Sequence, residues 1–236
     1  MPVVLMIYLF RTGSEQAMYS WYFIGDSHVQ SFEIAATLRL IQRPSRFLIV
    51  PGATAVGLRN PESQTHALAQ FSQALLPARP GIVPVIQLGE VDCGFVMWWR
   101  RQTYGECLEA QLQASLAAYA GFVDLLLAAG YPRLVITGAV PPTIRDGQTW
   151  GRVARARHEV TASQRERTEL TLRYNQALAH MAARRATAYI DISADILDRE
   201  TGLVAETYRN PNPRDHHLHP IKSAHLWAAA INRLTL

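Results

Sequence analysis

Short apolar runs, separated by longer mixed stretches, give the chain its most regular pattern. Five of these runs have the length of buried strands: 22–25, 47–50, 82–88, 133–139 and 188–192. Most are continuous rather than alternating, which is typical of strands covered on both faces, as in a parallel sheet between helices. The pattern therefore predicts a sheet of about five parallel strands.

Several of the intervening segments have helical periodicity. In 106–129, large apolar residues recur every three or four positions and Gly130 follows as a stop signal. Segment 163–185 opens with Ser163-x-x-Glu166, whose side chains can cap each other's free backbone N–H groups, and 221–234 is the last predicted helix. Because strands alternate with helices, we predict a doubly wound α/β sandwich.

The chain carries no internal repeat or linker, so 18–236 is predicted to be a single domain. Segment 141–162 has the weakest periodicity and is interpreted as a loop insertion that covers a site. Residues 1–17 are set apart as an N-terminal extension of uncertain status, because Met18 lies shortly before the first strand and offers another start. The apolar stretch 2–10 lacks the flanks of a secretory signal.

Composition limits the possible classes of protein. Apolar residues make up 49% of the chain and charged residues 18%, as in a folded protein with a core, and no apolar run approaches the roughly 20 residues that span a bilayer. Cys93 and Cys107 are too few for a disulfide framework and lack zinc-site spacing, so we expect a cytoplasmic protein.

The positive charge is local. The net charge is +4, and segment 145–173 alone holds seven arginines against four acids. Such a segment can bind anions or nucleic acid, and it can equally be a solvated helix face. No nucleic-acid motif supports the first interpretation, so neither a nucleic-acid partner nor a membrane span is predicted.

Candidate chemistry follows the predicted strands, since open α/β sheets bind ligands beyond the carboxyl ends of their strands. These positions are Gly25-Asp26-Ser27-His28, Pro51-Gly52, Gly89-Glu90-Val91-Asp92 and, before the last helix, Asp215-His216-His217-Leu218-His219-Pro220. A serine hydroxyl becomes a nucleophile when a histidine accepts its proton and a carboxylate orients that histidine, and Ser27, His219 and Asp215 can supply the three groups. A glycine such as Gly52 lets a backbone N–H approach an oxyanion.

Each of these residues also has a simpler interpretation. Ser27 can be a helix N-cap, Gly52 a tight turn, and Asp92 a tie between loops. Residues 98–101, two tryptophans followed by two arginines, can line a substrate cleft or pack on the surface. The cluster Asp215, His216, His217 and His219 also has the chemistry of a divalent metal site, although so many ligands in five residues rarely reach one ion.

The four positions in this order resemble the motifs of the GDSL or SGNH hydrolase family from about residue 20 to the end. The resemblance implies a flavodoxin-like three-layer α/β/α fold and metal-free hydrolysis of esters, thioesters or O-acyl groups. It assigns the nucleophile to Ser27, oxyanion donors to the N–H groups of Ser27 and Gly52, and the base and its orienting acid to His219 and Asp215. The run His219-Pro220-x-x-x-Ala224-His225 is similar to the family's His-Pro-x-x-x-Gly-His and favours His219 over His217.

Two departures from the family pattern affect this assignment. Val91 stands where the family usually has an asparagine that donates to the oxyanion; a protonated Glu90 could donate in its place, whereas an ionised one would repel the charge. The family spacing Asp-x-x-His is also absent, because Asp215 is followed by a histidine at 217 and another at 219.

Taken together, the sequence predicts a hydrolase that cleaves a small-molecule or glycan acyl ester through an acyl-enzyme on Ser27. The predicted catalytic residues are Ser27, Asp215 and His219, the predicted oxyanion and substrate-binding residues are Gly52, Glu90 and Asp92, and no cofactor is expected. An acyltransferase with the same intermediate and a catalytically lapsed binding module on the same fold are the alternatives. The oligomeric state is left open.

Overall fold

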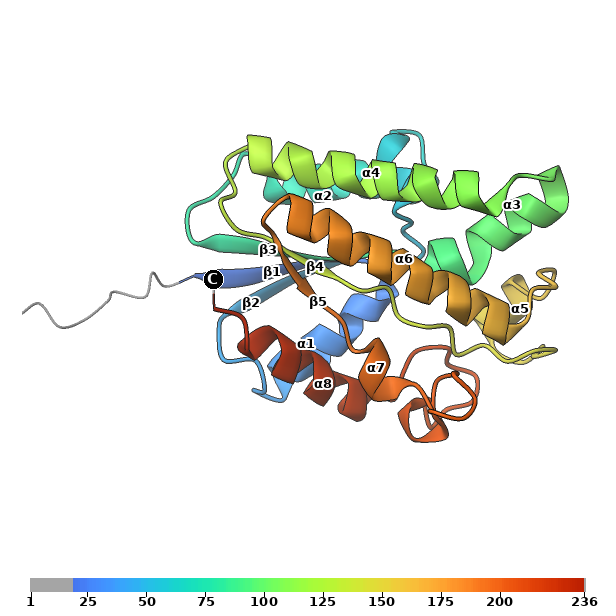
Figure 1. Cartoon of the computed structure of the whole chain (residues 1–236). Coiled ribbons are helices and arrows are strands. Elements are labelled where there is room, and N and C mark those ends of the chain that lie inside the picture. Colours follow the sequence, from blue (N-terminus) through green and yellow to red (C-terminus); the bar gives the residue numbers. More distant parts are fainter. Residues whose placement is uncertain (1–18, 236) are drawn as a thin grey trace, which may run out of the picture.

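A computed structural model describes residues 19–235, so the extension 1–17 lies outside the described residues (Figure 1). Its centre is a five-stranded parallel sheet in the order β2-β1-β3-β4-β5. The strands are β1 Ser20–Gly25, β2 Ser45–Ile49, β3 Ile82–Gln87, β4 Val135–Thr137 and β5 Ala188–Ile190. The prediction of about five parallel strands is confirmed.

Helices cover both faces of this sheet (Figure 1). One layer contains α2 Ala67–Leu75, α3 Met97–Tyr104, α4 Leu108–Ala128 and α6 Gln164–Arg184. The other contains α1 Gln30–Thr37, α7 Ser193–Ile196 and α8 Pro220–Asn232, and the short α5 Arg152–Ala156 lies beyond the sheet. This is the predicted three-layer α/β/α sandwich.

The continuous apolar runs arise from burial on both faces. Neighbouring residues of a strand point to opposite sides, and in β1 Phe23 packs into the core under α1 and α8 while Ile24 packs into the core under α2, α4 and α6. Phe23 stacks between Phe32 of α1 and Phe47 of β2, with ring centroids 4.5 and 5.2 Å away. Neither face of the sheet is left to solvent at β1, which fixes the strand that leads into Ser27.

The three predicted helices correspond to α4, α6 and α8. Ser163 caps α6 by accepting a hydrogen bond from the backbone N–H of Glu166, and the Glu166 carboxylate accepts one from the Ser163 N–H at 2.7 Å, as the capping-box pattern predicts. Among the described residues, α4 is long and apolar enough to cross a bilayer by length and composition alone. Core helices pass the same test, and the Tyr119 and Phe122 side chains of α4 are in the core.

Strand β4 is shorter than its apolar run. The run 133–139 predicts a strand up to Ala139, whereas β4 ends at Thr137. The reason is Asn175 of α6, whose side-chain amide accepts from the Ala139 N–H at 2.7 Å and donates to the Ala139 carbonyl at 2.9 Å. A side chain from a distant helix therefore replaces the sheet partner.

Candidate active site

Ser27 stands directly beyond the carboxyl end of β1. It opens a single 3-10 turn, Ser27–Val29, that leads into α1, and the cap of this turn is Asp26, whose carboxylate accepts the His28 N–H at 2.8 Å. The cap interpretation of Ser27 is therefore wrong. Gly25 has to be glycine, because a Cβ there would lie 1.9 Å from the Gln87 carbonyl oxygen of β3. The packed strands thus force the chain into this turn and present the Ser27 hydroxyl beyond the sheet.

His217, rather than His219, meets Ser27. Its Nε2 lies 2.9 Å from the Ser27 Oγ, and its Nδ1 lies 2.6 Å from Asp215 Oδ1. The predicted position of His219 at the serine is corrected: its Nδ1 accepts the Lys222 N–H at 3.5 Å at the N-cap of α8. Pro220, which favoured His219, is the first residue of α8 and marks the helix start instead.

The two-residue spacing of Asp215 and His217 has a local cause. The Asp215 Oδ1 accepts both the ring Nδ1–H and the backbone N–H of His217, the latter at 3.0 Å, which is the geometry of an Asx turn. One carboxylate oxygen therefore shapes the loop and orients the ring. The other predicted partner, Asp215, is placed at the site as expected.

The electrostatic surroundings of His217 suit a general base. Ser27, His217 and Asp215 are called the relay below. Burial and the positive charge of His28 lower the pKa of His217 more than Asp215 raises it, so the imidazole is neutral near pH 7. Burial acts to raise the pKa of Asp215, but its hydrogen bonds from the His217 backbone and ring outweigh that effect and lower it. With Nδ1–H donated to the Asp215 carboxylate, the lone pair of His217 Nε2 faces the Ser27 hydroxyl.

This lowered pKa predicts the acid limb of an activity profile. A base acts in its neutral form, and because the pKa of His217 lies below the ordinary 6.5, activity is expected to persist at pH 6.5 and to fall only at lower pH. The measurement is kcat/KM for an uncharged acyl ester between pH 4 and 9, with buffers of constant ionic strength. An acid-limb midpoint above 6.5 would contradict this electrostatic assignment.

Two backbone N–H groups just beyond the ends of β1 and β2 are without a hydrogen-bond acceptor in the described structure. No hydrogen bond among residues 19–235 uses the N–H of Ser27 or of Gly52. The Val50 N–H donates to the Gly25 carbonyl at 2.8 Å, which holds the loop after β2 next to the loop after β1. Gly52 has a φ of +78°, a backbone conformation that favours glycine, so it also makes the tight turn.

Asp92 holds that loop in place. Its carboxylate is fully buried and accepts the N–H groups of Ala55 at 2.8 Å and Val56 at 3.0 Å, together with the Ser115 hydroxyl at 2.8 Å. The interpretation as a tie between loops is therefore confirmed. Within residues 19–235 these bonds engage the Asp92 side chain away from Ser27, so its predicted oxyanion or substrate-binding role is corrected to that of a positioning residue.

Replacing Asp92 with alanine is expected to lower the free energy of unfolding by at least about 2 kcal/mol, because buried donors lose their acceptor. It should also reduce kcat more than it changes KM, since the Gly52 loop loses its anchor. Urea denaturation and steady-state kinetics measure the two effects. Asp92→Asn, which keeps one acceptor oxygen, should lie between wild type and Asp92→Ala; equal loss in both variants would contradict the role of the acceptor.

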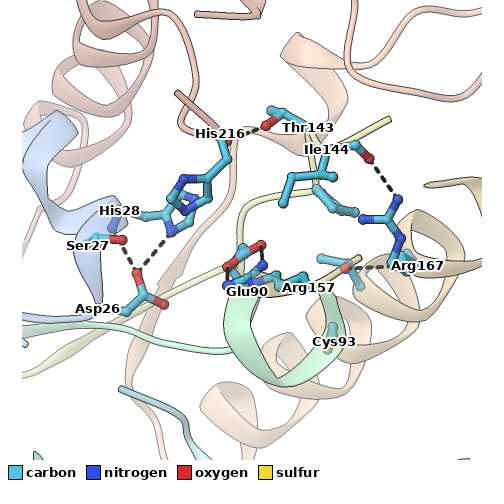
Figure 2. A network of polar contacts seen from close by, with 12 residues as sticks. Asp26, Ser27, His28, Glu90, Cys93, Thr143, Ile144, Arg157, Arg167 and His216 are labelled. Carbon is cyan, nitrogen blue, oxygen red and sulfur yellow. Dashed lines mark hydrogen bonds and ion pairs between the residues drawn. The ribbon is translucent and has the colours of Figure 1, made fainter. Parts of the chain in front are cut away.

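Glu90 is engaged by an arginine that the sequence analysis did not single out. Arg157, just after α5 in the insertion 141–162, donates to both Glu90 oxygens at 2.8 and 3.1 Å, and the two side chains are only 10% and 4% exposed (Figure 2). Burial acts to raise the pKa of Glu90, but the charges of Arg157 and His28 dominate and hold it far below its ordinary value. Glu90 is therefore ionised, which removes the protonated donor considered for the position beside Val91.

Arg157→Ala is expected to lower the free energy of unfolding by about 3–5 kcal/mol, because it leaves a buried carboxylate without its partner. The paired variant Glu90→Gln/Arg157→Met removes both charges and should cost clearly less. Chemical denaturation of the two variants beside wild type measures the difference. Similar losses in the single and the double variant would show that the ion pair is not what holds the insertion.

Three histidines from two loops meet at the serine. The ring of His28 lies 4.9 Å from that of His217 and 5.7 Å from that of His216, centroid to centroid, and the His216 and His217 rings are 4.1 Å apart. Burial acts to lower the pKa of His28, but the Asp26 carboxylate, 3.1 Å from its Nδ1, raises it overall. Burial lowers the pKa of His216 to about 3, so this ring is neutral.

The cluster Asp215, His216, His217 and His219, weighed from the sequence as an alternative metal site, does not gather at one point. His219 caps α8 and Asp215 binds His217, whereas His216 and His217 gather with His28. Nothing in the spacing of the sequence brings His28 to this cluster, since it lies nearly two hundred residues earlier. Its position immediately after Ser27 was the one feature of the sequence that could have placed His28 near the site.

A polar hollow of about 450 Å³ adjoins this site. Asp215 and His216 form one wall, and Trp150 from the insertion, which is nearly half exposed, lies on another. The pairs Trp98–Trp99 and Arg100–Arg101 line neither side, because they lie in α3, where Trp98 donates to the Cys93 carbonyl at 2.8 Å. Segment 141–162 therefore supplies part of the lining of this hollow.

Comparison with known proteins identifies the fold. Neither family models nor curated proteins match the sequence. Among solved structures, a proposed acylhydrolase from Bacteroides fragilis is 12% identical, with 94% of this chain and 88% of that chain covered and a TM-score of 0.61. A carbohydrate acetylesterase from Sinorhizobium meliloti is 12% identical over 92% of this chain and all (100%) of that one, with a TM-score of 0.59. A GDSL-like lipase from Bacteroides thetaiotaomicron is 14% identical over 92% of this chain and 90% of that one, with a TM-score of 0.57. The chain thus has the fold of SGNH hydrolases, as the resemblance implied.

Proposed function

We propose that this protein is a serine hydrolase that cleaves acyl esters through an acyl-enzyme on Ser27. The observation that carries the proposal is the relay Ser27 Oγ–His217 Nε2–Asp215 Oδ1, with distances of 2.9 and 2.6 Å, at the carboxyl edge of the sheet. Hydrogen-bonded nucleophile, base and orienting carboxylate are the arrangement that activates a serine.

In the first half-reaction, the Ser27 oxygen attacks the ester carbonyl as its proton passes to His217 Nε2. Asp215 stabilises the imidazolium and keeps the ring in the correct orientation. The tetrahedral intermediate collapses to the acyl-enzyme, and His217 gives the proton to the departing alcohol. Water then attacks the acyl group, with the same histidine as base, and regenerates Ser27.

The developing oxyanion would be held by the free N–H groups of Ser27 and Gly52. Val91 contributes no donor, and one missing oxyanion donor typically costs about 2.7–4 kcal/mol of transition-state stabilisation. The ionised Glu90 does not replace it, and its negative charge is neutralised by Arg157. We therefore expect turnover below that of a relative with the usual asparagine.

The substrate is proposed to be an acyl ester of a small molecule or glycan. The polar hollow beside Asp215 has room for an alcohol part, with Trp150 as an aromatic surface and Asn210 and Lys222 as hydrogen-bonding groups. The solved structures named as a carbohydrate acetylesterase and an acylhydrolase support this class. A cytoplasmic location remains a prediction.

The test is the time course of p-nitrophenyl acetate hydrolysis at enzyme concentrations high enough to resolve the first turnover. An acyl-enzyme mechanism predicts p-nitrophenol release in proportion to the enzyme and dependent on Ser27, and an initial burst wherever deacylation is slower than acylation. Acetylated Ser27 should be trapped by rapid acid quench and mass spectrometry. Turnover without any acylated serine would refute the proposed mechanism. Absence of both turnover and Ser27 acetylation would refute the proposed hydrolase activity.

A further inference from the structure

Three imidazoles converge beside the serine in an arrangement that its activation does not require. His28, from the turn after β1, and His216 and His217, from the loop before α8, each offer a ring nitrogen, and these nitrogens lie within 4.8 Å of one another. Within residues 19–235, no hydrogen bond engages Nε2 of His28 or either ring nitrogen of His216. Figure 2 shows the His28 and His216 rings side by side.

Two of these rings also have the outer partners that metal-binding histidines use. The carboxylate of Asp26 lies 3.1 Å from Nδ1 of His28, and that of Asp215 lies 2.6 Å from Nδ1 of His217. A carboxylate on one ring nitrogen fixes the tautomer, orients the ring and leaves Nε2 free as a ligand. The cluster thus combines three nitrogen ligands with two oriented carboxylates.

We propose that His28, His216 and His217 form a binding site for a divalent transition-metal ion such as Zn²⁺. Imidazole is a preferred ligand of zinc, and three histidines with a fourth, open position are a known zinc coordination. Zinc–nitrogen bonds of about 2.0–2.1 Å at tetrahedral angles place ligand nitrogens about 3.3 Å apart. Metal binding therefore requires the ring nitrogens to approach by up to about 1.5 Å from their 4.8 Å limit through side-chain rotation.

Charge favours a cation at this position. The carboxylates of Asp26, Asp215 and Glu90 surround the three rings, and Arg157 nearby is paired with Glu90. An ion bound to Nε2 of His28 takes the place of a proton there, so the two positive charges do not add. Mg²⁺ and Ca²⁺ prefer oxygen ligands, so the nitrogen cluster should discriminate against them.

Occupation of the site has a consequence for the relay. Nε2 of His217 cannot bind the ion and accept the Ser27 proton at once, so the bound metal would separate the base from the nucleophile. The site is therefore inhibitory, and this part of the inference rests on the proposed function. Metal binding itself does not depend on that function.

The experiment compares the full-length, chelator-treated protein with its His216→Ala and His225→Ala variants. Calorimetric titration with ZnCl₂ should give one ion per wild-type chain, at least about tenfold weaker binding in His216→Ala, and unchanged binding in His225→Ala, whose histidine is exposed on α8 outside the cluster. MgCl₂ should give no binding. If His216→Ala fails to fold by circular dichroism, His216→Asn takes its place.

The same samples are labelled with a fluorophosphonate with and without ZnCl₂. Zinc should slow labelling of the wild type, EDTA should restore it, and zinc should have little effect on His216→Ala. Absence of zinc binding to the wild type, or equal binding to wild type and His216→Ala, would overturn the site. Zinc that binds without slowing labelling would overturn its inhibitory role, whereas wild type that never labels, with zinc binding intact, would refute the hydrolase and leave the metal site standing.

Discussion

Ser27→Ala is expected to lower kcat/KM for an activated acyl ester by at least about 10³-fold, because no other group in the relay can form the acyl-enzyme. The substitution removes one hydroxyl whose hydrogen bond joins it to His217, so the fold should persist. Ester turnover by the purified variant, corrected for the uncatalysed rate, measures the loss.

Ser31→Ala is the matched control for this variant. Ser31 lies one turn further along in α1, and its hydroxyl is 3.0 Å from that of Ser223, away from the relay. It should retain activity near that of wild type. A Ser27→Ala variant with undiminished turnover, or an equal loss in Ser31→Ala, would show that the nucleophile lies elsewhere.

The second large effect separates the two neighbouring histidines. His217→Ala should lose at least about 10³-fold in kcat/KM, because Ser27 then has no acceptor for its proton. His219→Ala should lose less than about tenfold in kcat/KM and about 1 kcal/mol of stability, because it removes a helix cap and one lining side chain of the polar hollow but no proton acceptor of Ser27. Steady-state kinetics and thermal unfolding of both variants measure these differences.

This pair of variants decides between His217, which the structure places at Ser27, and His219, which the sequence motif favoured. If His219→Ala abolished turnover while His217→Ala kept it, the loop would have to rearrange before catalysis. The reverse result confirms that the Asx turn at Asp215 selects the base.

The sequence predicted the elements whose cause is local or periodic. The five apolar runs predicted β1 to β5, most clearly for β1, β3 and β4, whose faces are both covered. Ser163 and Glu166 predicted the start of α6 because a capping box needs only four residues. The helices α1 and α2 were expected between the strands but were given no bounds, since eight or nine residues hold too few turns for a clear period. Strand ends were also displaced where a distant side chain, such as Asn175, took over backbone hydrogen bonds.

The site was predicted only in part, for a related reason. Ser27 and Gly52 follow from the topology, which places the strand ends at one edge of the sheet, and Asp215 was singled out from its place before the last helix. The identity of the base does not follow from the topology. Pro220 marks the start of α8, and the sequence analysis took it as a sign that the neighbouring His219 is the base, whereas the Asx turn at Asp215 places His217 at the serine. Arg157 pairs with a residue 67 positions away, and no pattern in the sequence indicates that contact.

The most direct test of the central claim is the site of covalent modification by a fluorophosphonate, mapped by peptide mass spectrometry in the wild type, Ser27→Ala and His217→Ala. A nucleophile activated by His217 predicts one adduct per wild-type chain, located on Ser27, no adduct in Ser27→Ala and greatly slowed modification in His217→Ala. An adduct on any other residue, or modification that persists at the wild-type rate in either variant, would contradict it.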